Sequence, residues 1–337
     1  MLILINKCGT YKQVACYITK TFNMKILTIL FSLLFVGQFV FGQDKPTQRE
    51  LLLFEKGLLL QELVDDDLDL DRIINTNDST KLNKEFAKEI KETTLEKALE
   101  YYQELIDSFP KSTLLFRTLN NKGFIELALD DKDEAKKTFQ KIIDSKADDK
   151  EKGGIGSGIM AEPYANYKNR ASKVLANIYI ADSNYKEAIK YLDLTKTFPY
   201  RHFCGNEYAS NRIYMCSMYA KCYIELNEDK KAIETLLPEL LENGLANNSS
   251  IVELALTVLT KEYSKSELKT EFEQAFKNYK TEKVTKDKEE YEKFYIEFLD
   301  TKLQLNSWRL EGLEKEKLDT EIYKMCVNSK FFRLLNE

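Results

Sequence analysis

The chain has 337 residues, which is more than a single compact hydrophobic core usually serves. It contains only 12 glycines and 5 prolines while 31% of its residues are charged, and this scarcity of helix breakers favours long helices over a β-sandwich or barrel. The formal charge of -5 includes no basic tract, which argues against a nucleic-acid partner. The single histidine, His202, leaves almost the whole chain without the commonest metal ligand and general base. We therefore expect no catalytic residues, no metal and no cofactor.

Residues 24–42 have the features of a secretory signal peptide. A lysine follows Met24, an uninterrupted apolar run comes next, and Gly42 stands at a small-residue cleavage site. We expect residues 1–42 to be a leader and signal peptide with Met24 as the true start, and the mature protein to be periplasmic or extracellular. The alternative is an inner-membrane anchor through residues 26–42, but this run is shorter than the ~20 residues that a spanning helix needs. We expect no other membrane contact.

Removal of the leader would take away four lysines and no acid, changing the formal charge from -5 to -9. It would leave Cys204, Cys216, Cys222 and Cys326. Cys216 and Cys222 fall six residues apart on one predicted helix, so ~9 Å separates them along its axis, too far for a disulfide. A bridge from Cys204 to one of them stays open, but burial as small apolar side chains is favoured.

Residues 43–79 are expected to contain a packing helix followed by an acidic loop. Residues 47–64 are rich in leucine and predict an apolar helix that packs on the first repeated pair. The aspartates of residues 65–71 suggest a calcium loop, but Arg72 stands where the turn glycine is needed and Asp78 where a glutamate is needed. A solvated acidic loop is therefore the preferred interpretation.

Four segments share one pattern, centred on an alanine. Each alanine follows a charged pair and stands four residues before a large apolar residue, and three of the four have a small residue twelve positions earlier. The alanines are Ala98, Ala135, Ala188 and Ala232, the large residues are Tyr102, Phe139, Leu192 and Leu236, and the small residues are Gly123, Ala176 and Ala220. Small residues on two antiparallel helices let their backbones approach, while the large residues fill the groove to the next pair. The pattern predicts a series of helix pairs.

Local signals place the turns of these pairs. Polar clusters predict turns between paired helices at residues 129–132, 182–185 and 226–229. In the first pair, Thr93 and Glu96 have the spacing of a capping box and predict the start of its second helix. Phe86 occupies the small-residue position there, so the opening helix of this pair fits the pattern poorly.

The pattern resembles the tetratricopeptide repeat, a 34-residue helix–turn–helix unit. Residues 177–192 give the clearest match, residues 98–110 match a second helix ending at its terminal proline, and the resemblance covers about residues 80–240. It implies an all-α fold, a right-handed α-solenoid of helix hairpins that we expect over residues 80–282. It further implies a non-enzymatic adaptor or scaffold of the cell envelope whose partner is a protein or peptide.

The repeats are separated by insertions. The alanines are 37, 53 and 44 residues apart, which leaves 3, 19 and 10 residues beyond the repeat length, all between one pair and the next. We expect these insertions to emerge on one edge of the solenoid. The longest contains the glycine-rich run 153–158, which lacks the lysine and hydroxyl residue of a phosphate-binding loop and is interpreted as a flexible loop.

After the fourth pair the pattern weakens. Leu268 and Phe272 predict a fifth, degenerate pair, and residues 283–337 are expected to form a C-terminal capping segment. Within that segment, apolar runs on either side of Asp300-Thr301 in residues 294–305 predict either a small β-hairpin or one amphipathic helix.

In solenoids of this resemblance the first helix of each pair lines the concave face and contacts an extended peptide. Carried onto this chain, those positions form a partner-binding groove with a cationic and amide-bearing character, although Met218 stands where a complete carboxylate clamp would need asparagine. An ordinary solvated helix face is the alternative, and a glycan or small-ligand site built from surface aromatics is the second functional hypothesis. The groove residues are Arg117, Asn120, Phe124, Arg170, Lys173, Asn177, Tyr214 and Lys221.

Overall fold

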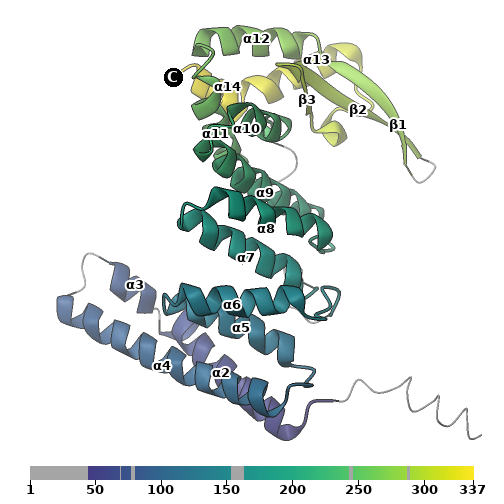
Figure 1. The fold of residues 1–337 in the computed structure, drawn as a ribbon. Helices are drawn as coiled ribbons and strands as arrows, with labels where there is room; N and C mark the ends of the chain where they lie inside the picture. Colours follow the sequence, from purple (N-terminus) through teal and green to yellow (C-terminus); the bar gives the residue numbers. More distant parts are fainter. Residues whose placement is uncertain (1–44, 69, 77–79, 153–162, 243–245, 287–288) are drawn as a thin grey trace, which may run out of the picture.

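The computed structural model describes residues 45–68, 70–76, 80–152, 163–242, 246–286 and 289–337. Helical layers stack in chain order, from α2 and α4 at one end to a small β-sheet with α12, α13 and α14 at the other (Figure 1). The helices are α2 (Gln48–Glu62), α3 (Leu70–Asn75), α4 (Lys81–Ser108), α5 (Leu115–Ala128), α6 (Lys132–Asp144), α7 (Tyr167–Ala181), α8 (Tyr185–Thr197), α9 (Gly205–Glu225), α10 (Asp229–Leu236), α11 (Ser249–Leu259), α12 (Lys265–Lys277), α13 (Lys315–Val327) and α14 (Lys330–Leu335). A π-helical turn η1 (Leu63–Asp67), the 3₁₀ turns η2 (Leu237–Glu239) and η3 (Ser307–Arg309), and the strands β1 (Lys280–Lys286), β2 (Glu289–Phe298) and β3 (Thr301–Gln304) complete the described elements.

Three helix hairpins, α5/α6, α7/α8 and α9/α10, confirm the predicted repeat pattern. All four pattern alanines and the four large residues that follow them are fully buried. Gly123 lies directly against the ring of Phe139, so a Cβ atom there would come within 2.7 Å of the ring. The hairpins therefore pack as closely as the small residues of the pattern predict.

The three predicted turns are present and share one backbone conformation. Asp130, Ser183 and Asn227 have φ values of 61°, 57° and 56°, and each stands five residues before its repeat alanine. In each turn the amide of the following residue donates to a carbonyl five residues earlier, as in Asn184 to Tyr179 at 2.7 Å. A single left-handed residue thus ends each first helix and starts the return helix.

The first repeat differs from the prediction. Helix α4 runs unbroken through Thr93, which is exposed, so the predicted capping box there is wrong, and Phe86 is 63% exposed instead of packed between helices. The helix that pairs with the Ala98 half of α4 is α2, where Gly57 lies against Tyr102 as Gly123 lies against Phe139. The residues 47–64 predicted to pack on the first pair therefore supply its first helix. In the other repeats, 11 residues lie between the small residue and the alanine. Between Gly57 and Ala98 there are 40 residues, so the two halves of the pattern lie far apart in the sequence.

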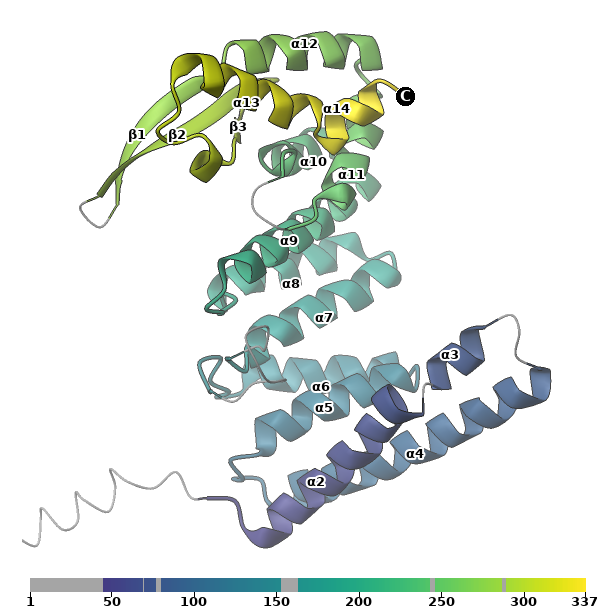
Figure 2. The ribbon, with the colours of Figure 1, turned by 180° about the vertical axis from the view of Figure 1, so that it is seen from behind.

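The described parts of two inter-repeat connections lie beside each other, namely residues 145–152 and 163–166 before α7 and residues 198–204 before α9 (Figure 2). Asn166 makes the connection, since its side-chain amide donates to the Arg201 carbonyl at 2.9 Å and its side-chain oxygen accepts from the Arg201 amide at 2.9 Å. The two insertions therefore share one edge of the helical stack. The glycine-rich run 153–158 lies outside the described residues.

The C-terminal region contains the predicted hairpin and one strand more. Strands β2 and β3 pair antiparallel with Phe298 opposite Thr301, and Leu299 and Asp300 form the two-residue turn with φ values of 46° and 59°. Strand β1 adds to the other edge of β2, which gives the sheet order β1-β2-β3. The hairpin prediction is confirmed and the alternative of one amphipathic helix is wrong.

The expected fifth pair is replaced by packing against the C-terminal region. Helix α12 carries Leu268 and Phe272, both buried, but its neighbours are α13, α14 and β2. Phe272 lies 5.3 Å from both Phe298 and Phe331, ring centre to ring centre, with steep interplanar angles. This aromatic cluster covers the end of the repeat stack. It shields the apolar surface of the last repeat helices from solvent.

Among the described residues, no helix is both long and apolar enough to cross a bilayer. The proposed signal segment, residues 24–42, lies outside the described part of the chain.

Candidate functional site

The first helices of the third and fourth repeats, α7 and α9, are joined by side-chain contacts on their shared face. Lys173 Nζ donates to Asn211 Oδ1 at 2.6 Å, and Asn177 Nδ2 donates to Tyr214 Oη at 2.6 Å. The Lys173 ammonium also lies 4.4 Å from the centre of the Tyr200 ring, a cation–π distance. We call the surface formed by Lys173, Asn177, Tyr200, Asn211 and Tyr214 the α7–α9 face.

The start of α7 is fixed by a carboxylate from the preceding insertion. Asp149 accepts the backbone amides of Lys168 at 2.7 Å and Asn169 at 3.3 Å, which satisfies donors that the first turn of a helix leaves open. Burial raises the pKa of the Asp149 carboxyl, against the opposing effect of these two hydrogen bonds. Asn169 in turn donates to the Phe198 carbonyl at 2.6 Å. These contacts position the insertion that carries Tyr200.

That insertion brings an aromatic cluster to the edge of the α7–α9 face. Tyr200 stacks on His202 with ring centres 6.1 Å apart, and His202 stacks on Phe203 at 4.8 Å. His202 is buried, and its Nδ1 accepts the Cys204 backbone amide at 2.9 Å, so it serves the loop structure. Phe203 is 57% exposed and Tyr208 is 44% exposed, which leaves two large rings beside the face in contact with solvent.

The predicted groove residues of the second repeat are engaged in packing. Arg117 Nη2 pairs with Glu151 at 3.2 Å and also bonds to Tyr167; burial lowers its pKa, but these two partners raise it more. Asn120 is only 2% exposed and its Oδ1 accepts no hydrogen bond, so the prediction that it faces a groove is corrected: it lies inside the helical layer. Phe124 packs edge-on against Phe139 at 5.4 Å.

The remaining predicted groove residues lie on α7 and α9. Arg170 is half-buried one turn before Lys173, and Lys221 is exposed two turns after Tyr214. Tyr214 is 37% exposed, and burial of the rest raises its pKa while the bond from Asn177 opposes this rise. The structure thus places Lys173, Asn177 and Tyr214 in two separate side-chain bonds that join α7 to α9.

Sequence reasoning missed Tyr200, Tyr208 and Asn211. Asn211 stands one helical turn before Tyr214 and could have been found by extending the groove positions along α9. Tyr200 and Tyr208 belong to an insertion, and no repeat position predicts which way an insertion folds. Met218 is buried among side chains of α7, α8 and α9.

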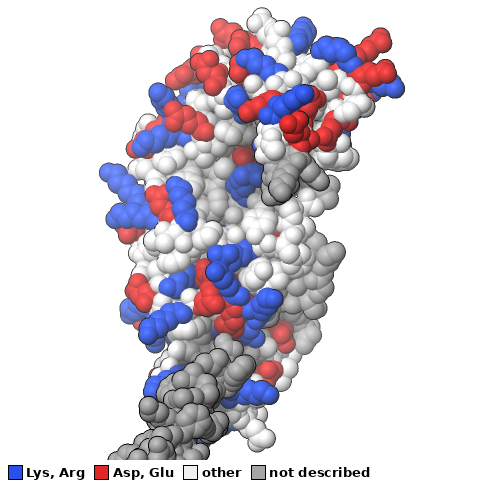
Figure 3. All heavy atoms as spheres, turned by 90° about the vertical axis from the view of Figure 1, so that its right-hand side faces the viewer, with Lys and Arg blue, Asp and Glu red and all other residues white. Residues whose placement is uncertain are grey.

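Charges of both signs are interspersed on the face seen in Figure 3, where Lys and Arg side chains lie beside Asp and Glu. The four described cysteines are free thiols, so no bridge joins Cys204 to the cysteines of α9. No group of three or more His, Cys, Asp or Glu residues within the described ranges is arranged to hold a metal ion. Part of the acidic run at residues 65–71 lies outside those ranges.

Comparison with protein-family models finds two matches, both to tetratricopeptide repeat models. One covers residues 116–149, which is the α5/α6 hairpin, and the other covers residues 90–112, which is the second half of α4. Among solved structures, a tetratricopeptide repeat protein from Parabacteroides merdae is similar, with 14% sequence identity, 84% of this chain and 100% of that chain covered, and a TM-score of 0.26. No curated protein matches the chain.

Proposed function

Because the chain is a tetratricopeptide repeat protein, and such repeats serve as scaffolds for protein–protein interaction, we propose that it is a non-enzymatic adaptor that holds a partner polypeptide. The binding surface in this proposal is the α7–α9 face. The observation that carries it is the pair of side-chain bonds between neighbouring first helices, Lys173 to Asn211 and Asn177 to Tyr214. These bonds fix two amide groups and a phenol at the surface without covering them from solvent.

An extended polypeptide fits the chemistry of this face. Amide side chains offer both a donor and an acceptor to a peptide backbone, as a partner strand does. Tyr214 and the neighbouring Phe203 and Tyr208 offer exposed rings, and aromatic residues are enriched at the centres of protein interfaces. The partner therefore supplies backbone amides and apolar side chains to the same surface.

We further propose that the bound segment is acidic. Arg170 and Lys173 place two positive charges on consecutive turns of α7. A carboxylate that bonds to such a group gains about 1.5–3 kcal/mol per contact, roughly twice a neutral hydrogen bond. The interaction therefore weakens as salt screens the charges.

The test begins with the partner captured by affinity purification from the cells that produce this protein. The double variant Arg170→Ala/Lys173→Ala should weaken binding of that partner by about tenfold or more, since tenfold corresponds to 1.4 kcal/mol. Lys190→Ala, which removes a 71% exposed lysine from α8, is the matched control and should leave the affinity unchanged. Unchanged affinity of the double variant, with an intact helical circular dichroism spectrum, refutes the α7–α9 face as the binding surface.

Binding of a glycan is the second candidate, favoured by the exposed rings of Phe203 and Tyr208. A pyranose stacks on an open aromatic face. Phe203 uses one face to stack on His202, and Tyr208 packs at right angles to Tyr200 at 6.0 Å. These contacts support a peptide over a sugar. Saturable binding of a cell-surface oligosaccharide that Tyr208→Ala abolishes would reverse the preference.

We also propose that the protein is exported, with cleavage after Gly42, and acts in the cell envelope. The support is the sequence of residues 24–42, a positive start followed by an apolar run and small residues. Mass spectrometry of the protein from its native cell should give a mature chain that begins at Gln43. A mass that retains residues 24–42 would mean an anchored protein instead.

A further inference from the structure

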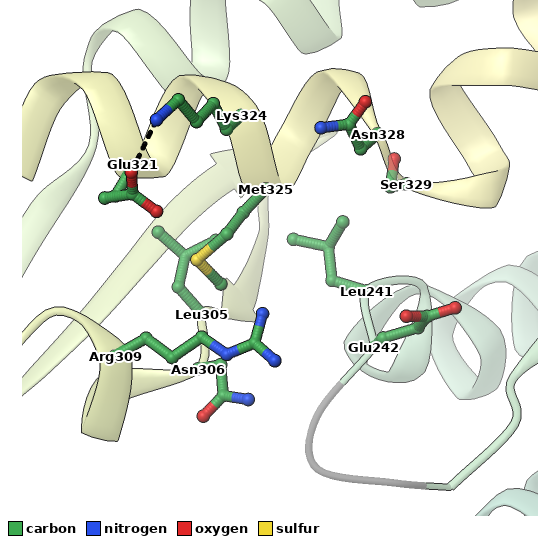
Figure 4. Close-up of a pocket in the computed structure, with 10 residues that line it drawn as sticks. All are labelled: Leu241, Glu242, Leu305, Asn306, Arg309, Glu321, Lys324, Met325, Asn328 and Ser329. Carbon is green, nitrogen blue, oxygen red and sulfur yellow. Dashed lines mark hydrogen bonds and ion pairs between the residues drawn. The ribbon is translucent and has the colours of Figure 1, made fainter.

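A second surface feature lies far from the α7–α9 face, where the C-terminal region meets the end of the repeats. A cavity of ≈ 350 Å³ opens between Leu241, the segment after β3, and α13. Figure 4 shows the Arg309 guanidinium next to Asn306 and below Met325, with Leu241 and Glu242 across from it. The sequence pattern gave no indication of this site, because its residues come from outside the repeats.

The backbone carbonyl of Asn306 accepts the Arg309 amide at 3.2 Å, but the side-chain amide of Asn306 has no described partner. Its side chain lines the cavity, only 6% of the residue is exposed, and no hydrogen bond joins its amide to another described residue. Its polar atoms are not sealed from solvent, so they can bond to a ligand that enters the cavity. Arg309 makes no described ion pair, and its guanidinium lies 5.1 Å from the centre of the Trp308 ring.

The other charges of the cavity identify the anion that fits. Lys324 is paired with Glu321 at 2.8 Å, so this lysine is already neutralised, and Glu242 adds a negative charge on the opposite side. The lining holds two positive and two negative side chains, so Arg309 is balanced only by Glu242, and a singly charged anion fits there better than a doubly charged phosphate. A single carboxylate matches the planar fork of Arg309 and takes a further donor from Asn306. Leu241, Leu305 and Met325 supply an apolar wall beside it.

A second hollow adjoins the cavity, which favours a chain over a free small molecule. This hollow shares Arg309, Glu321 and Lys324 with the cavity and extends along α13 past Trp308. Trp308, the only tryptophan of the chain, lines this second hollow and is 71% exposed. An extended peptide can place its end in the cavity and its preceding residues over the indole ring.

We propose that this C-terminal cavity binds the terminal carboxylate of a peptide that ends in an aliphatic residue. The carboxylate bonds to Arg309 and Asn306, the last side chain packs on Leu305 and Met325, and the preceding residues run along α13. The proposal does not depend on the α7–α9 face, since it uses different residues and a different part of the molecule.

The probe is the N-acetylated tetrapeptide Gly-Gly-Leu-Leu with a free carboxylate, titrated into the full chain by calorimetry and by the fluorescence of Trp308. The same peptide with a C-terminal carboxamide should bind with an affinity at least about tenfold lower, because it loses the charge-assisted bonds. Arg309→Ala should lower the affinity for the peptide with the free carboxylate by a similar factor. Arg309→Lys should restore only part of this affinity, because lysine keeps the charge but lacks the planar pair of donors of a guanidinium.

Arg333→Ala is the matched control, because it removes another exposed arginine, on α14, that does not line the cavity. It should bind both peptides as the unaltered chain does. Circular dichroism and a urea midpoint check that each variant is folded. Equal affinities for acid and amide, no binding of either peptide, or an Arg309→Ala variant that binds normally would each overturn the proposal. Tighter binding of free leucine than of the tetrapeptide would overturn the peptide assignment.

Discussion

At Gly57 the close approach of α2 and α4 depends on the absence of a side chain. An added Cβ would meet the Tyr102 ring at 2.4 Å, and this ring cannot move away because it is fully buried and its hydroxyl bonds to Asn121. Overpacking of this kind costs about 1–3 kcal/mol, whereas alanine gains at most about 1 kcal/mol of helix propensity over glycine. We predict that Gly57→Ala lowers the free energy of unfolding, as measured by urea denaturation.

Gly205→Ala is the control for this prediction. Gly205 begins α9, and nothing lies within 4 Å of the position a Cβ would occupy there. Its replacement should leave stability unchanged or raise it slightly. A Gly57→Ala variant as stable as Gly205→Ala would contradict the assignment of Gly57 to the small-residue position of the first repeat.

Two buried thiols, Cys222 and Cys326, and the half-buried thiol of Cys216 make stability depend on alkaline pH. Burial raises the pKa of Cys216 and Cys222 from 9.0 to about 11, and that of Cys326 to about 12. Between pH 9 and these values the unfolded thiols ionise while the folded thiols stay protonated, so the unfolded state binds fewer protons and stability falls as pH rises. We predict a progressive loss of unfolding free energy from about pH 9 to 11 in urea titrations under reducing conditions.

Cys326→Ala should reduce the steepness of this loss, because it removes the group with the largest of the three shifts. The comparison is between slopes against pH, so the separate cost of the smaller side chain does not affect it. Stability that stays constant or rises between pH 9 and 11 would show that these thiols are not buried as described.

Individual residues could be predicted where the repeat spacing is preserved. Ala176 and Ala188, twelve positions apart, predicted their own burial and the turn between them. Gly57 could not be found in this way, since the long insertion between it and Ala98 removes the spacing that identifies the pair. The exposure of Trp308 likewise depends on which elements surround it, and sequence alone does not give this.

Helix boundaries separate a real capping box from an apparent one. Ser264 at the start of α12 accepts the Glu267 amide at 3.2 Å, and the Glu267 carboxylate accepts the Ser264 amide at 2.8 Å. Thr93 and Glu96 have the same spacing but lie within α4. We predict that Ser264→Ala costs about 1 kcal/mol, whereas Thr93→Ala is neutral or slightly stabilising, as measured by urea denaturation.

Equal destabilisation by the two substitutions would indicate that α4 breaks near Thr93 after all. The difference arises because a capping box works only where the preceding residues leave the helix. Residues 81–92 have enough lysine, glutamate and leucine to continue as a helix, so the chain has no reason to stop there.

The strands illustrate the limit of local pattern at the scale of elements. Strands β2 and β3 could be predicted as one of two alternatives because apolar residues alternate on either side of a two-residue turn. Strand β1 has the sequence KTEKVTK, which is too polar to predict a strand. It forms because the edge of β2 offers it a full ladder of partners from Lys280 to Lys286.

For the molecule as a whole, the stacking order of the helix pairs could be predicted from the sequence. Only some residues of the proposed binding surface could be predicted in this way. Lys173, Asn177 and Tyr214 were predicted from repeat positions and lie together. Asn120 was predicted by the same rule and is buried, only 2% exposed. The insertions that carry Tyr200 and Tyr208 complete the surface and follow no repeat rule.

The central claim, that the α7–α9 face holds a polypeptide, is tested most directly by placing a photo-crosslinking residue on it. Benzoylphenylalanine in place of Asn177, an exposed residue of α7, should yield a covalent adduct with a protein partner on irradiation of the producing cells. The same residue in place of Lys190 on α8 should yield none. Adducts from both positions at equal yield, or from the α8 position alone, would contradict the account.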